Sequence, residues 1–129
     1  MAIGHYNGWT GEERLAVLPV LKAAVASGQI PPPTRCSICL ATGSPDWRAA
    51  DAILFHDEDY SRPLEAYTVC RACHKLIHLR FWFRDEWARH IASHARAGAW
   101  FEMLSLDPDS RYRPFIATYP DGLPPGFDP

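Results

Sequence analysis

The sequence predicts a small α+β domain in which a ββα core is flanked by N-terminal and C-terminal helices. Three observations indicate this fold. Two short apolar segments, residues 50–56 and 67–69, are typical of strands, and a helix pattern follows the second one directly. Amphipathic segments with helix caps lie before and after this core. Four cysteines form two close pairs, one before the first strand and one after the second: Cys36, Cys39, Cys70 and Cys73.

The chain has 129 residues, a length that fits a single domain. We divide it into an N-terminal helical segment (10–28), the cysteine-bearing core (34–83), a C-terminal helical segment (85–106) and a tail rich in Pro, Asp and Gly (107–129). A hydrophobic core of this size gains stability from a bound metal.

The N-terminal segment carries the signals of a helix. Thr10 and Glu13 form a capping-box pattern at its start, and Gly28 can end it. Pro19 is expected to kink this helix or divide it in two, because proline has no N–H to donate. We expect one apolar side, made of Leu15, Leu18, Leu21 and Val25.

The second half of the chain predicts two further helices. The first begins at the second cysteine pair and runs to about Phe83, and the second is capped by Asp85, covers residues 86–97 and ends at Gly98. Residues 100–106 are apolar and fit either a strand or a helix.

Aromatic and histidine side chains in these helices are expected to pack inside the protein. For the run Phe81-Trp82-Phe83 we expect core packing against the N-terminal helix, with stacking on nucleic-acid bases as the alternative. His90 and His94 share a helix face with apolar Trp87 and Ile91, which favours packing over metal binding.

The cysteine spacing predicts a Zn²⁺ site. Two residues between cysteines let both sulfurs of a tight turn reach one ion, and two such turns complete a tetrahedral thiolate shell. Redox C-x-x-C motifs and buried free thiols are the alternatives, but no alternating strand and helix pattern surrounds either pair. A zinc ion with four cysteine ligands has no open position, so this site is structural and any chemistry lies elsewhere.

We expect a cytoplasmic protein with no membrane partner. Residues 1–10 lack a positive start followed by an apolar run, and no segment approaches the ~18 apolar residues that a membrane span needs. In a reducing compartment, close cysteine pairs are better interpreted as metal ligands than as disulfides.

The segment 67–78, Tyr-Thr-Val-Cys-Arg-Ala-Cys-His-Lys-Leu-Ile-His, resembles the end of an HNH endonuclease domain, in which a treble-clef zinc scaffold supports a ββα-metal unit. In that family a histidine ends the first strand, and a C-x-x-C-H motif often begins the helix. This chain has His56 after a candidate strand and Cys70-Arg-Ala-Cys73-His74 at the helix start. The resemblance covers residues 34–80.

The resemblance implies a role for each of three histidines. His56 would be the general base that activates water, a task that suits a side chain titrating near neutral pH. His74 and His78 would hold a second divalent metal, Mg²⁺ or another cation, that stabilises charge on the scissile phosphate. These two histidines are four residues apart, so they share one helix face.

Two departures from the family pattern are visible in the sequence. The family carries an Asp or His ligand just before the general base, where this chain has Phe55. The family's asparagine before the second cysteine pair is absent, and Glu65 lies near that place. We name three candidates for a replacement carboxylate: Asp57, Glu58 and Asp59.

Local charge favours nucleic acid as a partner, although the formal net charge of −2 gives no overall attraction to a polyanion. Basic residues outnumber acidic ones between residues 70 and 97, and an ordinary solvated helix surface is the alternative interpretation. The candidate nucleic-acid contacts are Arg71, Lys75, Arg80 and Arg84.

These observations predict an HNH-like zinc protein that acts on nucleic acid, with DNA as the expected partner and metal-dependent cleavage of phosphodiester bonds as the candidate reaction. Two alternatives without chemistry fit the same residues. One is a zinc-supported module that binds nucleic acid. The other is a module that binds a protein partner through its aromatic surface.

Overall fold

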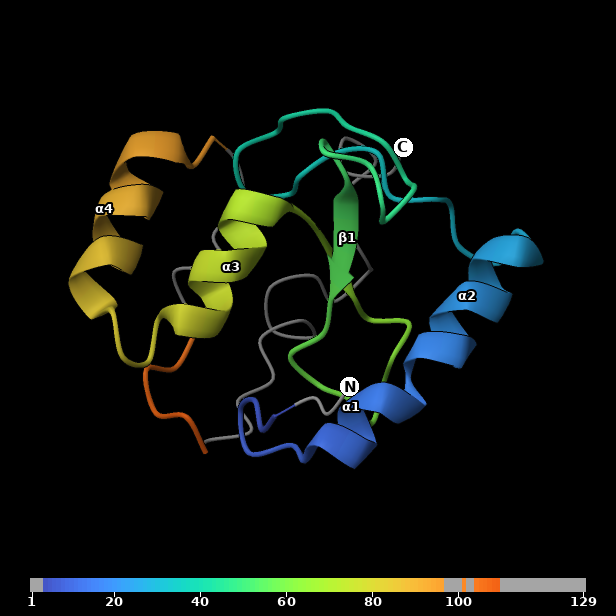
Figure 1. The fold of residues 1–129 in the computed structure, drawn as a ribbon, viewed down its shortest axis with the longest axis horizontal. Coiled ribbons are helices and arrows are strands. Elements are labelled where there is room, and N and C mark those ends of the chain that lie inside the picture. Colours follow the sequence, from blue (N-terminus) through green and yellow to red (C-terminus); the bar gives the residue numbers. More distant parts are fainter. Residues whose placement is uncertain (1–3, 97–100, 102–103, 110–129) are drawn as a thin grey trace.

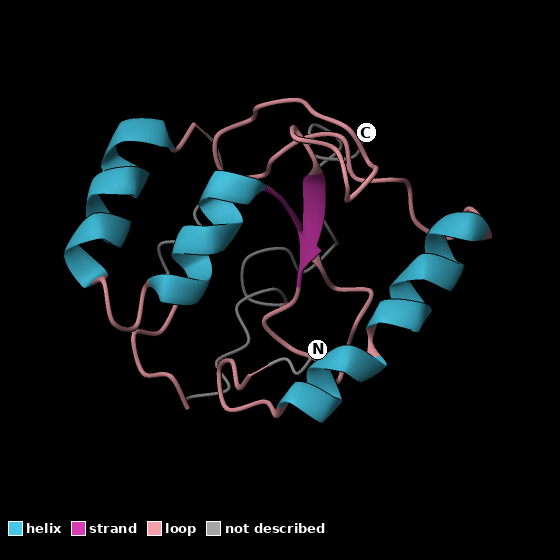
Figure 2. Cartoon of the chain, in the orientation of Figure 1, coloured by secondary structure: helices cyan, strands magenta, loops and turns pink. Residues whose placement is uncertain are grey.

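The computed structural model describes residues 4–96, 101 and 104–109 and has the predicted α+β architecture. Its elements in chain order are helices α1 (Gly11–Ala16) and α2 (Leu18–Ala26), strands β1 (Ile53–His56) and β2 (Tyr67–Cys70), and helices α3 (Arg71–Leu79) and α4 (Arg84–His94). Helix α3 lies between the two-stranded hairpin and α4, while α1 and α2 lie on the other side of the hairpin (Figures 1 and 2).

The hairpin and α3 together decide where the histidines lie. Strands β1 and β2 are antiparallel, with Ile53 opposite Cys70 and His56 opposite Tyr67. Three residues along β1, about 10 Å, therefore separate the Cys70 end of the hairpin from His56. Helix α3 begins at that same end and runs back along the hairpin, advancing about 1.5 Å per residue. Its second and third turns are thereby brought level with His56.

One main hydrophobic core joins the hairpin to α3 and α4. Tyr67 and Val69 from β2 and Ile77 from α3 are each 0% exposed. On α3 the buried positions are Cys73 and Ile77, four residues apart, so one stripe of this helix faces the hairpin. Trp87 of α4 packs into the same cluster.

The N-terminal segment is divided into two helices, as the proline predicts. Thr10 and Glu13 form the expected capping box on α1, and Val17 separates α1 from α2. The predicted apolar side is wrong at two of its positions, because Leu15 and Leu18 are 41% and 53% exposed. Leu21 is buried as predicted, and Val17 and Ala24 are buried beside it. The break at Val17 changes the helix direction, so a single periodicity does not run through both helices.

The boundaries of α3 and α4 also differ from the prediction. Helix α3 ends at Leu79, whose carbonyl accepts hydrogen bonds from the backbone N–H groups of Trp82 (3.1 Å) and Phe83 (2.9 Å) in a tight turn. Helix α4 then begins at Arg84, so Asp85 lies in its first turn instead of at the cap. Helix α4 ends at His94, and Ala95 is extended, so the predicted helix to residue 97 is too long. Gly98 and the tail from residue 110 lie outside the described residues. No described helix is long and apolar enough to cross a membrane.

The aromatic run at 81–83 is split between the interior and the surface. Phe81 is buried and packs against Tyr6, with 5.6 Å between ring centroids. Trp82 and Phe83 are 67% and 47% exposed, so core packing is confirmed for Phe81 and does not extend to the other two side chains. The α3–α4 turn explains this, because it rotates the chain away from the core directly after Phe81.

We expect the Ile77→Ala variant to lose about 2–5 kcal/mol of unfolding free energy, because the change leaves a cavity in the core. The matched Leu18→Ala variant removes a mostly exposed side chain, so we expect a change within about 0.5 kcal/mol. Urea unfolding followed by circular dichroism measures both. A large loss in Leu18→Ala would contradict the described packing of α2.

Candidate metal centres

The four cysteines form one cluster that is consistent with a structural Zn²⁺ site. One sulfur from each of Cys36, Cys39, Cys70 and Cys73 lies within 4.8 Å of the others. Cys39 Sγ and Cys70 Sγ are 3.9 Å apart. Zinc–sulfur bonds of about 2.3 Å in a tetrahedron place neighbouring sulfurs about 3.8 Å apart, so this spacing fits the ion.

The first cysteine pair lies in a tight knuckle of the backbone. The N–H of Ile38 donates to Cys36 Sγ (3.4 Å), and the N–H of Leu40 donates to the Cys36 carbonyl (3.0 Å). Leu40 has a φ of 64°, in the left-handed region that residues with a side chain seldom adopt. Nothing in the local sequence predicts a positive φ at Leu40. A loop that is held around an ion would account for this backbone conformation.

The second pair lies at the junction of β2 and α3. Cys70 is the last residue of β2, and Cys73 lies in the first turn of α3. His90 Nε2 lies 3.1 Å from Cys73 Sγ, so α4 also supports the cluster through a side-chain contact to a ligand atom. His90 is half-buried and its ring stacks on that of His94, which is exposed, so the predicted packing is wrong for His94.

Mutual contacts between the thiols perturb their protonation. The side-chain hydrogen bond with Cys70 raises the pKa of Cys36 to about 12. The side-chain hydrogen bond with Cys36 raises the pKa of Cys73 above its usual range and lowers the pKa of Cys70. Four thiolates so close together repel one another unless a cation is present. Zinc binding should therefore release protons and stabilise the fold.

We expect zinc removal by a strong chelator to unfold residues 36–79, because a structural zinc site contributes about 10 kcal/mol or more to folding. The measurement is far-ultraviolet circular dichroism and thermal melting, with zinc content determined by atomic absorption. Re-addition of zinc should restore both signals. Unchanged helicity and melting in protein shown to be zinc-free would contradict a structural role for the cluster.

Three histidines form a second cluster. His56 ends β1, and His74 and His78 lie one turn apart on α3. One ring nitrogen of each lies within 4.8 Å of the other two, and His74 Nε2 and His78 Nε2 are 3.0 Å apart. Nitrogen atoms that share one transition-metal ion are about 3.0–3.4 Å apart for bonds of 2.0–2.1 Å, so this cluster fits such an ion.

Burial keeps these imidazoles neutral. Desolvation lowers the pKa of His56 well below its usual 6.5, and it lowers the pKa of His74 to about 3. Desolvation and the neighbouring His56 likewise lower the pKa of His78. A neutral imidazole has a free nitrogen lone pair, which is the form that binds metal.

An N-terminal turn that the sequence analysis did not single out closes this cluster. Residues 6–9 form a tight hairpin turn in which Asn7 and Gly8 both have positive φ. The Tyr6 ring lies 4.4 Å from the His78 ring between centroids, and its hydroxyl lies 3.2 Å from His56 Nε2. The dipeptide Asn-Gly is the usual sequence signal for such a turn, and it is the local feature from which this turn could have been predicted.

The acidic run after β1, residues 57–59, lies in a loop and is buried. Glu58 is 2% exposed, and its carboxylate contacts His56 Nε2, the Tyr6 hydroxyl and Arg80. Asp59 instead accepts hydrogen bonds from Ser61 within a local turn. Of the three candidate carboxylates, Glu58 is therefore the one that the fold directs toward the histidines.

Arg80 is not available as a nucleic-acid contact, which corrects the sequence-based expectation. Its side chain is 0% exposed. The guanidinium lies 3.3 Å from Glu58 Oε1 and donates to the carbonyls of Ile77 (2.9 Å) and Ser105 (2.9 Å). A charge this deep in the protein is tolerated because its donors are paired.

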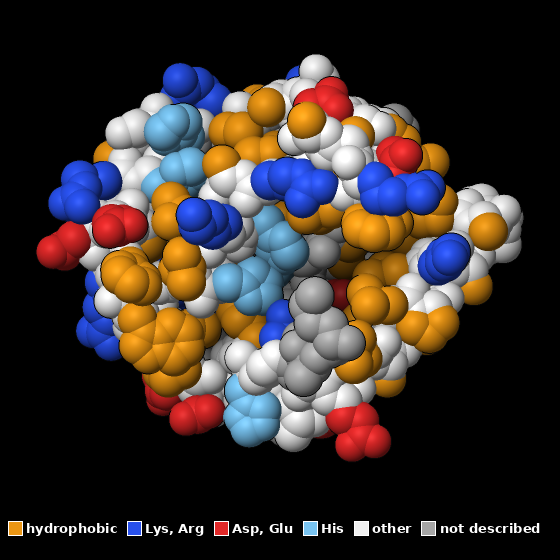
Figure 3. All heavy atoms as spheres, in the orientation of Figure 1, with side chains coloured by type: hydrophobic (Ala, Val, Ile, Leu, Met, Phe, Trp, Pro, Cys, Tyr) orange, Lys and Arg blue, Asp and Glu red, His pale blue; other side chains and the backbone are white. Residues whose placement is uncertain are grey.

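The histidine cluster opens to the surface through a hollow, which we call the histidine hollow. It has a volume of about 320 Å³ and is lined by Leu54, Arg71, His74, Lys75, His78 and Leu79. Figure 3 shows histidine side chains at the centre of this face with Lys and Arg side chains beside them. Lys75 is exposed, whereas the Arg71 guanidinium donates to the carbonyl of Ala49 (3.1 Å).

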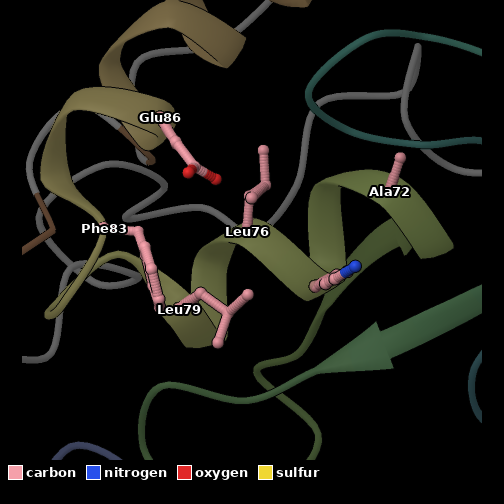
Figure 4. Close-up of a pocket in the computed structure, with 6 residues that line it drawn as sticks. Ala72, Leu76, Leu79, Phe83 and Glu86 are labelled. Carbon is pink, nitrogen blue, oxygen red and sulfur yellow. The ribbon is translucent and has the colours of Figure 1, made fainter.

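A second hollow lies between α3 and α4. Its volume is also about 320 Å³, and Figure 4 shows Leu76, Leu79 and Phe83 on one side with Glu86 of α4 facing them. It shares Lys75 and Leu79 with the histidine hollow. Arg84, the remaining predicted contact, is exposed and lies beside Trp82 and Phe83.

Comparisons with known proteins return no match: no family model, no curated protein and no solved structure is similar to this chain.

Proposed function

We propose that this protein is a metal-dependent enzyme of the HNH type that hydrolyses phosphodiester bonds in nucleic acid. The observation that carries the proposal is the meeting of three imidazole nitrogens beside a basic, open hollow. His56 comes from the end of a strand, and His74 directly follows a zinc-knuckle cysteine. This is the arrangement that the sequence resemblance implies for a ββα-metal unit.

The donor set supports a transition metal over Mg²⁺. Imidazole suits Zn²⁺, Ni²⁺, Fe²⁺ and Cu²⁺, whereas Mg²⁺ prefers carboxylate, carbonyl and water oxygen. His56, His74 and His78 would hold the ion through one nitrogen each. When bound, such an ion supplies positive charge beside the scissile phosphate and lowers the pKa of a neighbouring water.

In this proposal His56 is a metal ligand instead of the general base that the resemblance first suggested. Its side chain is 0% exposed, and its ring contacts both of the other histidines, with 5.2 Å between centroids in each pair. Its contacts with both helix histidines place His56 within the cluster itself, as a ligand. Phe55 then does not leave the metal site without a ligand, because His56 itself occupies the ligand position.

This shift of one residue places Asp57 where the family pattern has its general base. The Oδ1 atom of Asp57 is buried without a hydrogen-bond partner among the described residues. Burial and the nearby charges of Asp59 and Glu58 raise the pKa of Asp57 to about 8. With a pKa of about 8, this carboxyl becomes ionised, and able to accept a proton, as the pH rises toward 8.

Residues at the rim of the histidine hollow would position the substrate. Lys75 lies on the same exposed side of α3 as the hollow and can bind a phosphate oxygen. Arg71 lines the hollow too, with its side chain anchored on the loop at residues 47–49. Leu54 and Leu79 supply apolar walls that limit water at the reacting centre.

We expect the wild-type protein to nick supercoiled plasmid with Ni²⁺, Co²⁺ or Mn²⁺, and the His74→Ala variant to lose more than about 100-fold of this rate. Loss of a ligand should exceed the ~10–100-fold effect of losing an outer-shell partner. The matched control is His94→Ala on α4, which should nick at the wild-type rate. Agarose electrophoresis of the topoisomers measures all three proteins.

Two results would contradict the enzyme. Equal nicking by wild type and His74→Ala would identify a contaminant. No nicking with any metal, in protein that carries zinc at the cysteines, would leave a zinc-supported binding module as the better description.

A pair of variants separates the ligand from the base. We expect His56→Ala to lower both the affinity for a second metal and the nicking rate. Asp57→Asn should keep the metal affinity and lose at least about 100-fold in rate, since general base catalysis contributes ~10²–10⁴-fold. Isothermal titration calorimetry with Ni²⁺ supplies the affinity. Full metal affinity in an inactive His56→Ala protein would restore His56 as the base.

A further inference from the structure

Two large aromatic side chains are exposed at the turn between α3 and α4. Trp82 is 67% exposed and Phe83 is 47% exposed, although side chains of this size are mostly buried in proteins. Figure 3 shows hydrophobic side chains gathered at this turn, on the same face as the central histidines. Neighbouring exposed apolar groups of this kind typically mark a binding surface.

The protein holds the two rings at a defined place. The backbone N–H groups of Trp82 and Phe83 both donate to a carbonyl at the end of α3. The Trp82 ring meets the buried Phe81 ring edge to face, with 5.5 Å between centroids. Phe81 in turn packs against Tyr6, whose ring contacts that of His78. A series of ring contacts therefore fixes the aromatic turn relative to the histidine cluster.

Adjoining hollows lead from the histidines to this turn. The histidine hollow and the hollow between α3 and α4 share Lys75 and Leu79. The hollow between α3 and α4 also shares Phe83 and Glu86 with a third hollow of about 490 Å³, which Trp82 lines. One path over α3 therefore joins the candidate metal ligands to the exposed aromatic rings.

The charges along this path suit a strand that has its phosphates at the rim and its bases inside. Lys75, Arg84 and Arg89 are exposed there and can bind phosphate oxygens. Asp85 and Glu86 are exposed there too, and Figure 4 shows Glu86 facing the apolar side of its hollow. A carboxylate in that position repels a phosphate, but it can accept a hydrogen bond from the amino group of an uncharged base.

This surface suits unpaired nucleotides better than a duplex. In a duplex the bases stack on one another, so a side chain at the protein surface meets phosphates and groove edges instead of base faces. Proteins that bind single strands combine a basic groove with aromatic rings on which successive bases stack. The path over α3 has both features, whereas a protein partner would leave the three cations at its rim without a matching charge.

We propose that this protein binds single-stranded nucleic acid, with unpaired bases stacked on Trp82 and Phe83 and the adjoining backbone led past Lys75 into the histidine hollow. The proposal rests on the proposed function for the cleavage that follows, but the binding is tested without a second metal. It makes an unpaired strand the substrate of the histidine site. Negative supercoiling favours unpaired segments, so nicking of a supercoiled plasmid is compatible with such a substrate.

The test is fluorescence anisotropy of a short labelled DNA strand, and of its duplex, with the full chain loaded with zinc at the cysteines. We expect the single strand to bind more tightly than the duplex. Trp82→Ala should lose about 5–150-fold of the affinity for the single strand, the usual effect of removing one stacking ring, and Phe83→Ala a similar amount. Trp82→Phe keeps a ring and should retain most of the affinity.

Trp47→Ala is the matched control. Trp47 is 68% exposed, as Trp82 is, but it lies in the loop before β1 instead of at the α3–α4 turn. This variant should bind the single strand as the wild type does.

Equal affinity for single strand and duplex, wild-type affinity in Trp82→Ala, or the same loss in Trp47→Ala would overturn the proposal. No binding of either DNA would also overturn it and would favour a protein partner for the aromatic surface. Circular dichroism reports whether each variant folds, and Phe83→Ala carries the test if Trp82→Ala does not. Strand binding without nicking would refute the enzyme and leave this binding surface in place.

Discussion

The clustering of four cysteine sulfurs, which is consistent with one structural zinc ion, is the constraint on which the rest of this fold depends. It brings the knuckle at residues 36–39 to the junction between β2 and α3, where the N–H of Ser37 also donates to the carbonyl of Thr68 (2.7 Å). The position of that junction sets where α3 begins. Because His74 directly follows Cys73, the cysteine cluster and the histidine cluster share the start of this helix.

The interior next to the histidines is polar, which is unusual for so small a protein. Glu58 and Arg80 form a buried ion pair, and Tyr6 joins them to His56. Breaking such a pair typically costs about 3–5 kcal/mol, because the remaining charge is left without a partner in a medium of low dielectric constant. A chain with a modest core retains this network at a cost. The metal site that we propose at the histidines would account for it.

Two neighbouring hollows on α3 suit different candidate partners. The histidine hollow places the candidate metal ligands His74 and His78 beside the exposed cation of Lys75, which suits a phosphate. The hollow beside α4 is lined by Leu76, Leu79 and Phe83 and carries the acidic Glu86, so it suits a less charged group. The net charge of −2 is therefore compatible with a nucleic-acid substrate, since attraction needs only to be local.

The sequence by itself determined the features that depend on short spacings. These are the zinc site, the shared helix face of His74 and His78, the capping box at Thr10 and the order of strands and helices. Each follows from residues fewer than about five positions apart or from a repeated motif. Tertiary structure alone decided that Tyr6 closes the cluster, that Glu58 faces it and that Arg80 is buried. These outcomes depend on segments that are about 20 to 75 residues apart, and packing between such segments leaves no periodicity to read in either one.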